Sequence, residues 1–397
     1  MKKVLIIGAG FLQDFVICKA KNMGYETYAV DGNSNAVGFK HADHYEVIDI
    51  VDEKACLAYA KENQIDGVLT AATDYGVLTA AYIACEMGLP GLKYEVAQLI
   101  KNKYRVRKCL FENHVDDTEQ AYVVDKETEL NGLSKKLVFP VMVKPCDGSG
   151  SRGVSRVDSV SSFECACQYA MDLSITHRAM VETFVVGKEY GAESIVLNGD
   201  VYVLGIMRKW MTEPPCYAEL GHAIPTDLPA EVEQRAVQCV KKAIKALGIN
   251  FGSVNMDILI TSEGKIHIID IGARMGGNMI GPCVIPYGTG IDYIANMIRN
   301  AVGDKVDLTS FGHSSVVTRL LAFGDGIVKQ LPDFRKIEKE YGVEIYHHLE
   351  VGQVVRKYCT NIDGCGYIVA KADNIDISIH KAENVLELIL STIFWSD

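Results

Sequence analysis

The chain has 397 residues, of which 48% are hydrophobic, and a net charge of −11 from 40 basic and 51 acidic side chains. This length favours two or three domains, and an acidic chain without a long basic run is not typical of nucleic-acid-binding proteins. No apolar run reaches the roughly 18 residues of a membrane-spanning helix. We therefore expect a cytoplasmic protein with neither a membrane nor a nucleic-acid partner.

Strand and helix signals alternate through residues 1–95. Short apolar runs predict strands at Val4–Ile7, Glu26–Val30, Val47–Ile50 and Gly67–Thr70. Strands that alternate with helices predict a parallel sheet with right-handed crossovers. Within this region Gly8-Ala9-Gly10 begins a dinucleotide-binding fingerprint that lacks its third glycine, so NAD binding is the less favoured alternative.

The stretch Val138–Val154 combines a short β-branched run with a glycine-rich loop. Lys144 ends the run, and the following proline holds Lys144 in an extended conformation. Residues 147–153 read DGSGSRG. Glycines at this density let backbone N–H groups converge on an anion, and a lysine just upstream suits the same anion. The segment predicts a phosphate-binding loop, with a flexible polar hairpin as the alternative. It is not a Walker loop, because the lysine precedes the glycines.

Two hairpins follow later in the chain. Asn198-Gly199 lies between two apolar runs, which is a strong hairpin signal, and residues 211–229 then read as a loop. The second hairpin is predicted for Ser253–Thr261 and Lys265–Ile271. With Glu263-Gly264 as its two-residue turn, counting outward places Asp257 opposite Asp270. Opposed carboxylates repel one another, and a Mg²⁺–phosphate pair explains such an arrangement better than an ordinary core does.

Twelve cysteines are scattered along the chain. Cys165 and Cys167, like Cys359 and Cys365, lack the paired C-x-x-C spacing of a zinc site. We expect reduced thiols, as in a cytosolic protein.

Taken together, these segments resemble the ATP-grasp superfamily, whose members join a carboxylate to an amine through an acyl-phosphate. The strand–Lys–Pro–DGSGSRGV segment is similar to the ATP-binding loop of that family. Residues 179–190, AMVETFVVGKEY, are similar to its hinge. The resemblance implies that backbone groups of Glu182 and Val185 read the adenine edge and that Glu189 binds the ribose. Residues implied to contact the rest of the nucleotide are Lys103, Lys144, Ser149, Gly150 and Ser151.

The same resemblance assigns the acids and the segment GARMGGN that follows them. Asp257 and Asp270 match the Mg²⁺ ligands, with Mn²⁺ as an alternative ion, and Arg274 matches the catalytic arginine that holds the γ-phosphate and the acyl-phosphate. Gly272 stands where the family has an asparagine ligand, so water or Asn278 would complete the metal shell. Arg208, Lys209, His222 and Asn278 are candidates for the substrate pocket, with a structural role as the alternative for each.

The implied fold class is α/β and α+β. It consists of a Rossmann-like domain at 1–95, an ATP-grasp domain at 96–312 (subdomains 96–178 and 179–312) and a small C-terminal domain at 313–397. The C-terminal part and GARMGGN resemble the L-amino-acid ligase branch. The expected partners are a small-molecule carboxylate and an amine, and a homodimer is an open alternative. A purine-biosynthesis or carbamoyl-phosphate-type ligase, and a non-catalytic ATP-binding protein, are the alternative functions.

Overall fold

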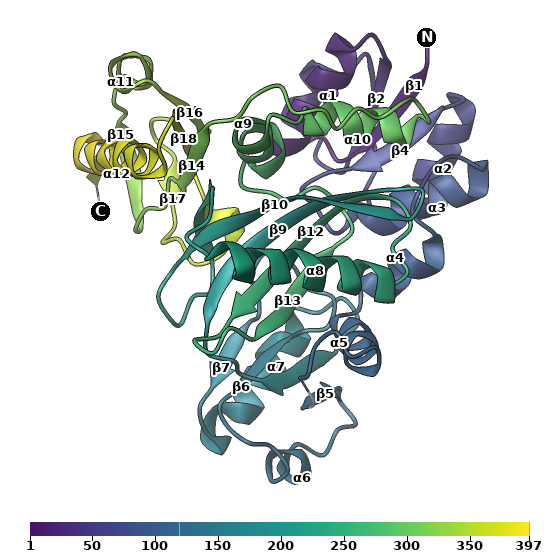
Figure 1. Ribbon diagram of the computed structural model, residues 1–397, viewed down its shortest axis with the longest axis vertical. Helices are drawn as coiled ribbons and strands as arrows, with labels where there is room; N and C mark the ends of the chain where they lie inside the picture. The colour runs from purple at the N-terminus through teal and green to yellow at the C-terminus, as the bar shows by residue number, and fades with distance from the viewer. Residues whose placement is uncertain (119, 397) are drawn as a thin grey trace.

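The computed structural model describes residues 1–118 and 120–396, and within them the strands form four sheets (Figure 1). The first sheet is parallel, in the order β3-β2-β1-β4, as the alternation of strands and helices predicts. Its strands and the helices between them are β1 (Lys3–Ile7), α1 (Phe11–Asn22), β2 (Glu26–Asp31), η1 (Val37–Lys40), β3 (His44–Val47), α2 (Glu53–Glu62), β4 (Gly67–Thr70) and α3 (Gly76–Met87).

Strand β3 lies earlier in the chain than the strand predicted at Val47–Ile50, so that boundary is wrong. All four residues of β3 are exposed, because β3 is the edge of its sheet. An exposed edge strand carries no apolar pattern that would mark its position.

The second sheet is antiparallel, in the order β5-β8-β6-β7, and holds the glycine-rich loop. Val141 and Val143 of β6 pack against α7, so the alternate residues Met142 and Lys144 face the opposite side of the sheet. The elements of this part are α4 (Tyr94–Ile100), α5 (Lys103–Glu112), β5 (Ala121–Val124), α6 (Leu130–Ser134), β6 (Val141–Pro145), β7 (Ser155–Val157), η2 (Val160–Ser162), α7 (Phe163–Asp172) and β8 (Ala179–Thr183).

The third sheet has eight strands in the order β13-β12-β9-β10-β11-β14-β18-β16. Both predicted hairpins are present, as β9–β10 and β12–β13. Its first strands and their helices are β9 (Lys188–Leu197), β10 (Asp200–Met211), β11 (Glu219–Ile224), α8 (Ala230–Ala246), β12 (Gly252–Ile260), β13 (Ile266–Gly272), η3 (Ile280–Val284), α9 (Ile285–Thr289) and α10 (Tyr293–Ala301).

Two predictions about this sheet need comment. Residues 211–229 are not all loop, because β11 forms there and pairs with β10 and, far along the chain, with β14. A strand that depends on so distant a partner leaves little local signal. The sheet also runs across the predicted boundary at 312–313, since β14, β16 and β18 continue it. The division into three domains stays a prediction.

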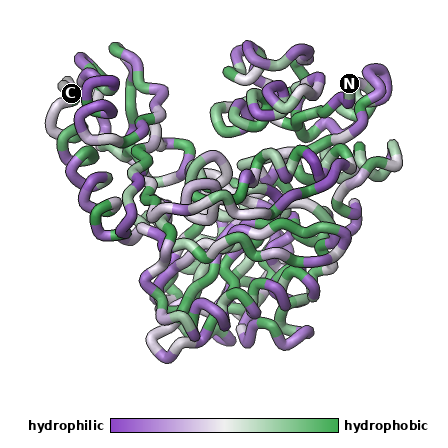
Figure 2. The backbone as a smooth tube through the Cα atoms, turned by 45° about the horizontal axis from the view of Figure 1, so that its top comes forward, coloured by the Kyte–Doolittle hydropathy of each residue, from purple (hydrophilic) through white to green (hydrophobic). Residues whose placement is uncertain are grey.

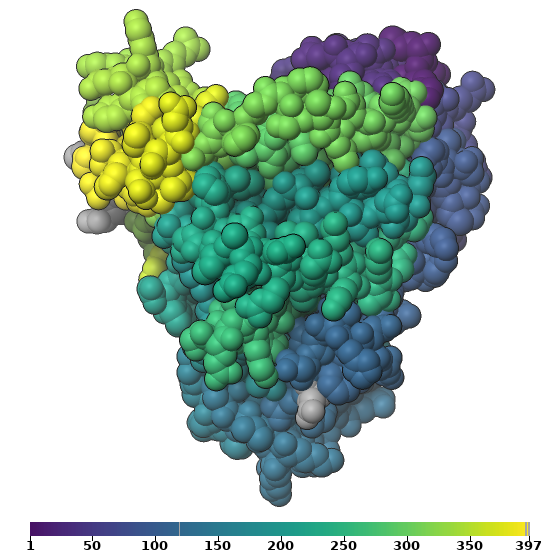
Figure 3. All heavy atoms as spheres, in the orientation of Figure 1, coloured from purple at the N-terminus to yellow at the C-terminus, as the bar shows by residue number. Residues whose placement is uncertain are grey.

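The C-terminal part adds a small sheet, β17-β15-β19, and two helices beside the continued strands. In the space-filling view this part (yellow) and the N-terminal sheet (purple) lie at opposite upper corners, above the central strands (teal) (Figure 3). Its elements are β14 (Ser315–Leu320), β15 (Gly326–Gln330), α11 (Phe334–Tyr341), β16 (Val343–His347), β17 (Val354–Val355), η4 (Asn361–Asp363), β18 (Gly366–Ala372), α12 (Ile375–Thr392) and β19 (Phe394–Ser396).

The central sheet has two unlike faces. Helix α8 covers one of them (Figure 1), where Val254, Met256 and Ile258 of β12 pack in its apolar core. Side chains of a strand alternate between faces, so Asn255 and Asp257 point to the other side. The backbone tube in Figure 2 is hydrophobic over many inner stretches and hydrophilic at many outer turns. Asn255 and Asp257 are polar residues that alternate with buried apolar residues along β12.

Cys216 and Cys359 form a disulfide, with 5.2 Å between their Cα atoms. The expectation that the thiols are all reduced is wrong for this pair, while the other ten cysteines are free. The two residues are 143 positions apart, and the pairing of β11 with β14 and of β14 with β18 brings their loops together. Cysteine spacing alone could not indicate that contact.

Among the helices of the described residues, none is both long and apolar enough to cross a membrane.

Candidate active site

A cavity of about 740 Å³ lies between the β5-β8-β6-β7 sheet and the uncovered face of the eight-stranded sheet. Residues from both sheets, from α5 and from the glycine-rich loop line it. The predicted site residues among them are Lys103, Lys144, Ser149, Gly150, Ser151, Glu182, Val185, Glu189, Asp257, Asp270, Arg274 and Asn278. The residues that line the cavity run from Leu12 to Tyr367, so the fold gathers distant parts of the chain around one space.

The glycine-rich loop is held over this cavity by contacts to two other parts of the chain. Gly150 and Ser151 have positive φ angles of 65° and 61°, a conformation that glycine adopts without strain. The Ser151 hydroxyl donates to the backbone carbonyl of Tyr217 at 2.6 Å, and Arg152 Nη2 donates to the Tyr75 hydroxyl at 2.5 Å. The loop therefore connects the β10–β11 loop with the N-terminal sheet region.

Lys144 belongs to a buried chain of ion pairs. Its Nζ lies 2.5 Å from Glu182 Oε1, while Arg107 Nε donates to Glu182 Oε2 at 2.8 Å and Arg107 Nη1 donates to Asp116 at 2.9 Å. Burial disfavours the ionised form of Glu182, but the two cations outweigh it and hold its pKa below the ordinary value. Lys144 thus reaches the cavity as a fixed cation.

Asp257 and Asp270 are cross-strand partners, as predicted. The turn on which that prediction rested is different, because Thr261 pairs with Lys265 around a three-residue turn. A β-bulge then inserts Ile269 into β13 and brings the two acids back opposite each other. The carbonyl of Ile269 accepts a hydrogen bond from Lys144 Nζ at 3.2 Å, so the bulge also ties the acids to the glycine-loop strand.

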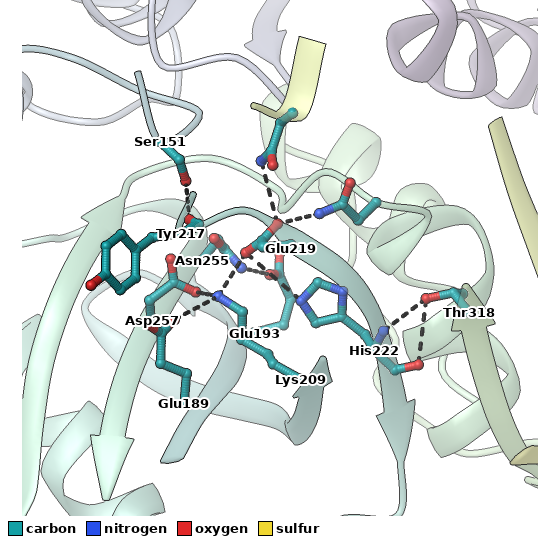
Figure 4. A network of polar contacts seen from close by, with 12 residues as sticks. Ser151, Glu189, Glu193, Lys209, Tyr217, Glu219, His222, Asn255, Asp257 and Thr318 are labelled. Carbon is teal, nitrogen blue, oxygen red and sulfur yellow. Dashed lines mark hydrogen bonds and ion pairs between the residues drawn. The ribbon is translucent and has the colours of Figure 1, made fainter. Parts of the chain in front are cut away.

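Each acid is bound by a lysine. Lys103 Nζ contacts Asp270 Oδ2. Burial opposes ionisation of Asp270, but Lys103 and Lys144 outweigh it and lower its pKa. Asp257 is bound by the buried Lys209 of β10. Lys209 Nζ lies 2.8 Å from Asp257, 2.7 Å from Glu219 and 3.5 Å from Glu189 (Figure 4).

One ammonium among three carboxylates leaves an excess of negative charge. Burial, together with the neighbouring Glu219 and Glu189, raises the pKa of Asp257 to about 6 despite the attraction of Lys209. Carboxylate oxygens are the ligands that Mg²⁺ prefers. Asp257 and Asp270, which lie opposite each other on β12 and β13, therefore fit a divalent cation. Such an ion would relieve the repulsion between carboxylates that raises the pKa of Asp257.

Arg274 is paired with Asp74, a residue of the loop after β4. Arg274 Nε lies 2.9 Å from Asp74 Oδ1, and Nη2 donates to Oδ2 at 3.1 Å. Burial opposes the charged guanidinium, but Asp74 outweighs it and raises the pKa of Arg274. This bidentate pair explains Gly272: a Cβ at position 272 would lie 2.7 Å from Asp74 Oδ1 and 3.0 Å from Arg274 Cζ. An asparagine does not fit there while the pair is formed.

Of the four candidates for substrate contacts, Lys209 is bound by the acids described above, and the other three lie in different environments. Arg208 is not among the residues that line the cavity, because it stacks on Trp210 at 4.5 Å on the face opposite Lys209. His222 is buried beneath Glu219, with 4.0 Å from Nε2 to Oε1, and burial lowers its pKa to about 4. Asn278 does line the cavity, where its amide donates to Glu219 and accepts a hydrogen bond from the Tyr367 hydroxyl.

Several residues that line the cavity were not predicted, and they are Asp74, Glu219, Asn255, Asn361 and Tyr367. Asp74 follows the carboxyl end of a parallel strand, where ligands commonly bind in α/β sheets, and that signal was present in the sequence. The others lie in loops or alternate with apolar strand residues. Only the packing of the C-terminal part against β11 brings Asn361 and Tyr367 to the cavity.

Comparison with known proteins gives a domain family and a fold. Residues 137–282 match the model of the ATP-grasp domain. The formate-dependent phosphoribosylglycinamide formyltransferase of Methanocaldococcus jannaschii is 26% identical over 279 residues, which are 66% of this chain and 68% of that enzyme. Carnosine synthase 1 of Homo sapiens is 22% identical over 331 residues, 76% of this chain but only 40% of that enzyme.

A solved structure matches over the whole length. The crystal structure of L-amino acid ligase from Bacillus licheniformis covers 100% of this chain and 99% of its own, with a TM-score of 0.84 and 21% identity. At this identity the likeness concerns the fold. The mixed α/β architecture expected from the sequence is thereby confirmed.

Proposed function

We propose that this chain, whose residues 137–282 match the ATP-grasp domain, forms an amide bond between a carboxylate and an amine at the expense of ATP. The observation that carries the proposal is the meeting of three groups in one cavity: the opposed Asp257 and Asp270, the fork of Arg274, and the glycine-rich loop. An amino acid is the proposed carboxylate substrate, since relatives that act on amino acids include carnosine synthase 1.

ATP would lie along the cavity from the hinge to the glycine-rich loop. The backbone N–H of Val185 makes no backbone hydrogen bond within residues 1–118 and 120–396, so it is available to the adenine edge. The carbonyl of Glu182, which belongs to the paired strand β8, would provide the second contact. Glu189 lines the next part of the cavity, where it would accept hydrogen bonds from the ribose. Lys144, Lys103 and the N–H groups of residues 149–151 would then bind the phosphates as fixed donors.

Asp257 and Asp270 would hold Mg²⁺. The ion supplies positive charge that neutralises the phosphate oxygens when it is bound. The carboxylates are positioned by the β-bulge at Ile269, and Lys103 and Lys209 keep them ionised and in place before the ion arrives.

Arg274 is the proposed catalytic residue. Its guanidinium lines the cavity. An arginine carries five N–H donors, more than Asp74 and Asn255 use, so it would also bind a carboxylate or a phosphoryl group during transfer. In the reaction the substrate carboxylate oxygen attacks the γ-phosphorus and ADP leaves. The amine then attacks the acyl carbon and phosphate leaves, so that the products are an amide, ADP and phosphate. Arg274 would stabilise the negative charge on both groups, and the loop held by Ser151 and Arg152 would exclude water.

The test is phosphate release from ATP across a plate of amino-acid pairs, with mass detection of a product lighter than the pair by one water. We expect slow release from ATP alone and strong stimulation by the correct pair. Arg274→Ala should abolish the stimulation while ATP still binds. Stimulation by bicarbonate or a purine ribotide, with none by amino acids, would instead favour a purine-biosynthesis or carbamoyl-phosphate-type ligase.

A further inference from the structure

Glu193 is a fully buried carboxylate one layer beneath the cavity, and it has no place in the reaction described above. Glu193 lies on β9 and is 0% exposed. It is on the same side of the strand as Gly191, two residues earlier. Oε1 accepts hydrogen bonds from the backbone N–H of Gly276 at 3.0 Å and from the Tyr293 hydroxyl at 2.5 Å. Oε2 accepts from Asn255 Nδ2 at 3.0 Å (Figure 4).

Two of these contacts lead to Arg274. Asn255 donates to Glu193 through Nδ2, so its Oδ1 is turned toward Arg274 and accepts from Nη1 at 3.2 Å. A rotation of that amide would place Oδ1 against a carboxylate oxygen, which is unfavourable. Gly276 follows Arg274 by two residues, so its N–H bond to Glu193 also holds the backbone from which the guanidinium extends.

The space around these contacts is tight. A Cβ on Gly276 would lie 2.8 Å from Asn255 Nδ2 and 3.0 Å from Glu193 Oε2. A carboxylate left in such a site without hydrogen bonds would be costly, and here three donors satisfy it. The donors are directed at Glu193 from three separate elements: Asn255 from β12, Tyr293 from α10 and Gly276 from the loop after β13.

We propose that Glu193 is a positioning residue, which orients the guanidinium of Arg274 through Asn255 and Gly276 and so sets the rate of the proposed ligation. This inference rests on the proposed function of Arg274. Burial raises the pKa of Glu193 to about 7, against the hydrogen bonds from Tyr293, Gly276 and Asn255. Protonation would add a donor where the neighbours also donate, so an ionised Glu193 is the form that supports this geometry.

The first test compares Glu193→Gln with Ser194→Ala. Glutamine has the size of glutamate but must direct an amide N–H₂ at a donor. Ser194 is the next residue of β9, equally buried, and its side chain faces the other side of the sheet, so it controls for disturbance of the strand. We expect Glu193→Gln to lower kcat about 10- to 100-fold with the KM for ATP nearly unchanged, and Ser194→Ala to keep both.

The second test needs no turnover. The Nε–H signal of Arg274 is identified by NMR from its loss in Arg274→Lys. We expect this signal to shift or broaden in Glu193→Gln and to stay in place in Ser194→Ala. An unchanged signal in Glu193→Gln overturns the proposal, whatever the activity. So does an unchanged kcat, or a parallel loss of kcat and ATP affinity. If no pair of substrates is turned over by the wild type, the proposed function fails but the NMR comparison still decides the role of Glu193.

Discussion

The replacement Gly272→Asn tests the relation between Gly272 and the Asp74–Arg274 ion pair. It installs the amide found at this position in the family that the chain resembles. In this protein a Cβ at residue 272 would be 2.7 Å from Asp74 Oδ1 and 3.0 Å from Arg274 Cζ, so the ion pair has to open. We expect a loss of activity rather than a better metal site.

The magnitude follows from what the pair contributes. One charge-assisted hydrogen bond of 3.1 Å and one ion-pair contact of 2.9 Å join the residues, and the side chains are 16% and 24% exposed. A hydrogen bond to a charged group contributes about 1.5–3 kcal/mol, and partial exposure to solvent keeps the further contribution of the ion-pair contact small. A loss of about 1.5–3 kcal/mol in the orientation of Arg274 corresponds to roughly a 10- to 150-fold lower kcat/KM.

The assay is a double-mutant cycle with Asp74→Ala, read by phosphate release at saturating Mg²⁺. Each single variant should lose activity, and the double variant should lose little more than Gly272→Asn alone, because the same ion pair is broken in both. The reasoning would be refuted by a Gly272→Asn variant with unchanged kcat/KM and a lower Mg²⁺ requirement, since the added amide would then bind the ion without disturbing Arg274.

Three further predictions follow from the same site and its surroundings. Asp257→Asn and Asp270→Asn should each raise the Mg²⁺ concentration needed for half-maximal activity, with Mg²⁺-free nucleotide binding by calorimetry nearly unchanged; a response from only one contradicts a site built on both. Cys216→Ser should lower the free energy of unfolding by about 2–5 kcal/mol in urea without reductant. If adding reductant does not change the free energy of unfolding of the wild type, the disulfide is contradicted. Burial lowers the pKa of His222 from 6.5 to about 4. The unfolded chain therefore binds a proton first as pH falls through 6.5, and up to about 3 kcal/mol of stability is lost between pH 6.5 and 4. His222→Asn should remove that part of the pH dependence, and parallel stability curves for the two proteins would show the assignment to be wrong.

Much of the local structure was predictable. The strands Lys3–Ile7, Glu26–Asp31 and Gly67–Thr70 lie where apolar periodicity and turn residues place them. These signals are strong because each depends on neighbours within a few positions. Strand β11 and the position of β3 were missed for the opposite reason: one depends on a distant partner and the other is an exposed edge.

The pairing of Asp257 with Asp270 was predictable from local signals, but the turn and the bulge that produce it were not. A period of two along each strand and a short turn were enough to place the acids face to face. The actual turn has three residues, and the bulge at Ile269 compensates for it. Nothing in the apolar pattern marks a bulge, because Ile269 continues the run of isoleucines on either side.

The sequence by itself determined the parallel first sheet, the lysine and glycines of the proposed phosphate-binding loop, and the residue types of the proposed metal and phosphate site. These are properties of short segments, set by backbone sterics and side-chain chemistry. Only the tertiary structure decided that Asp74 pairs with Arg274, that Lys209 lies among three carboxylates, and that Cys216 joins Cys359. Each of these pairs depends on how sheets far apart in the chain pack together. A local sequence pattern does not indicate which distant residues meet, because such contacts depend on the packing of the whole fold and not on residues close in the sequence.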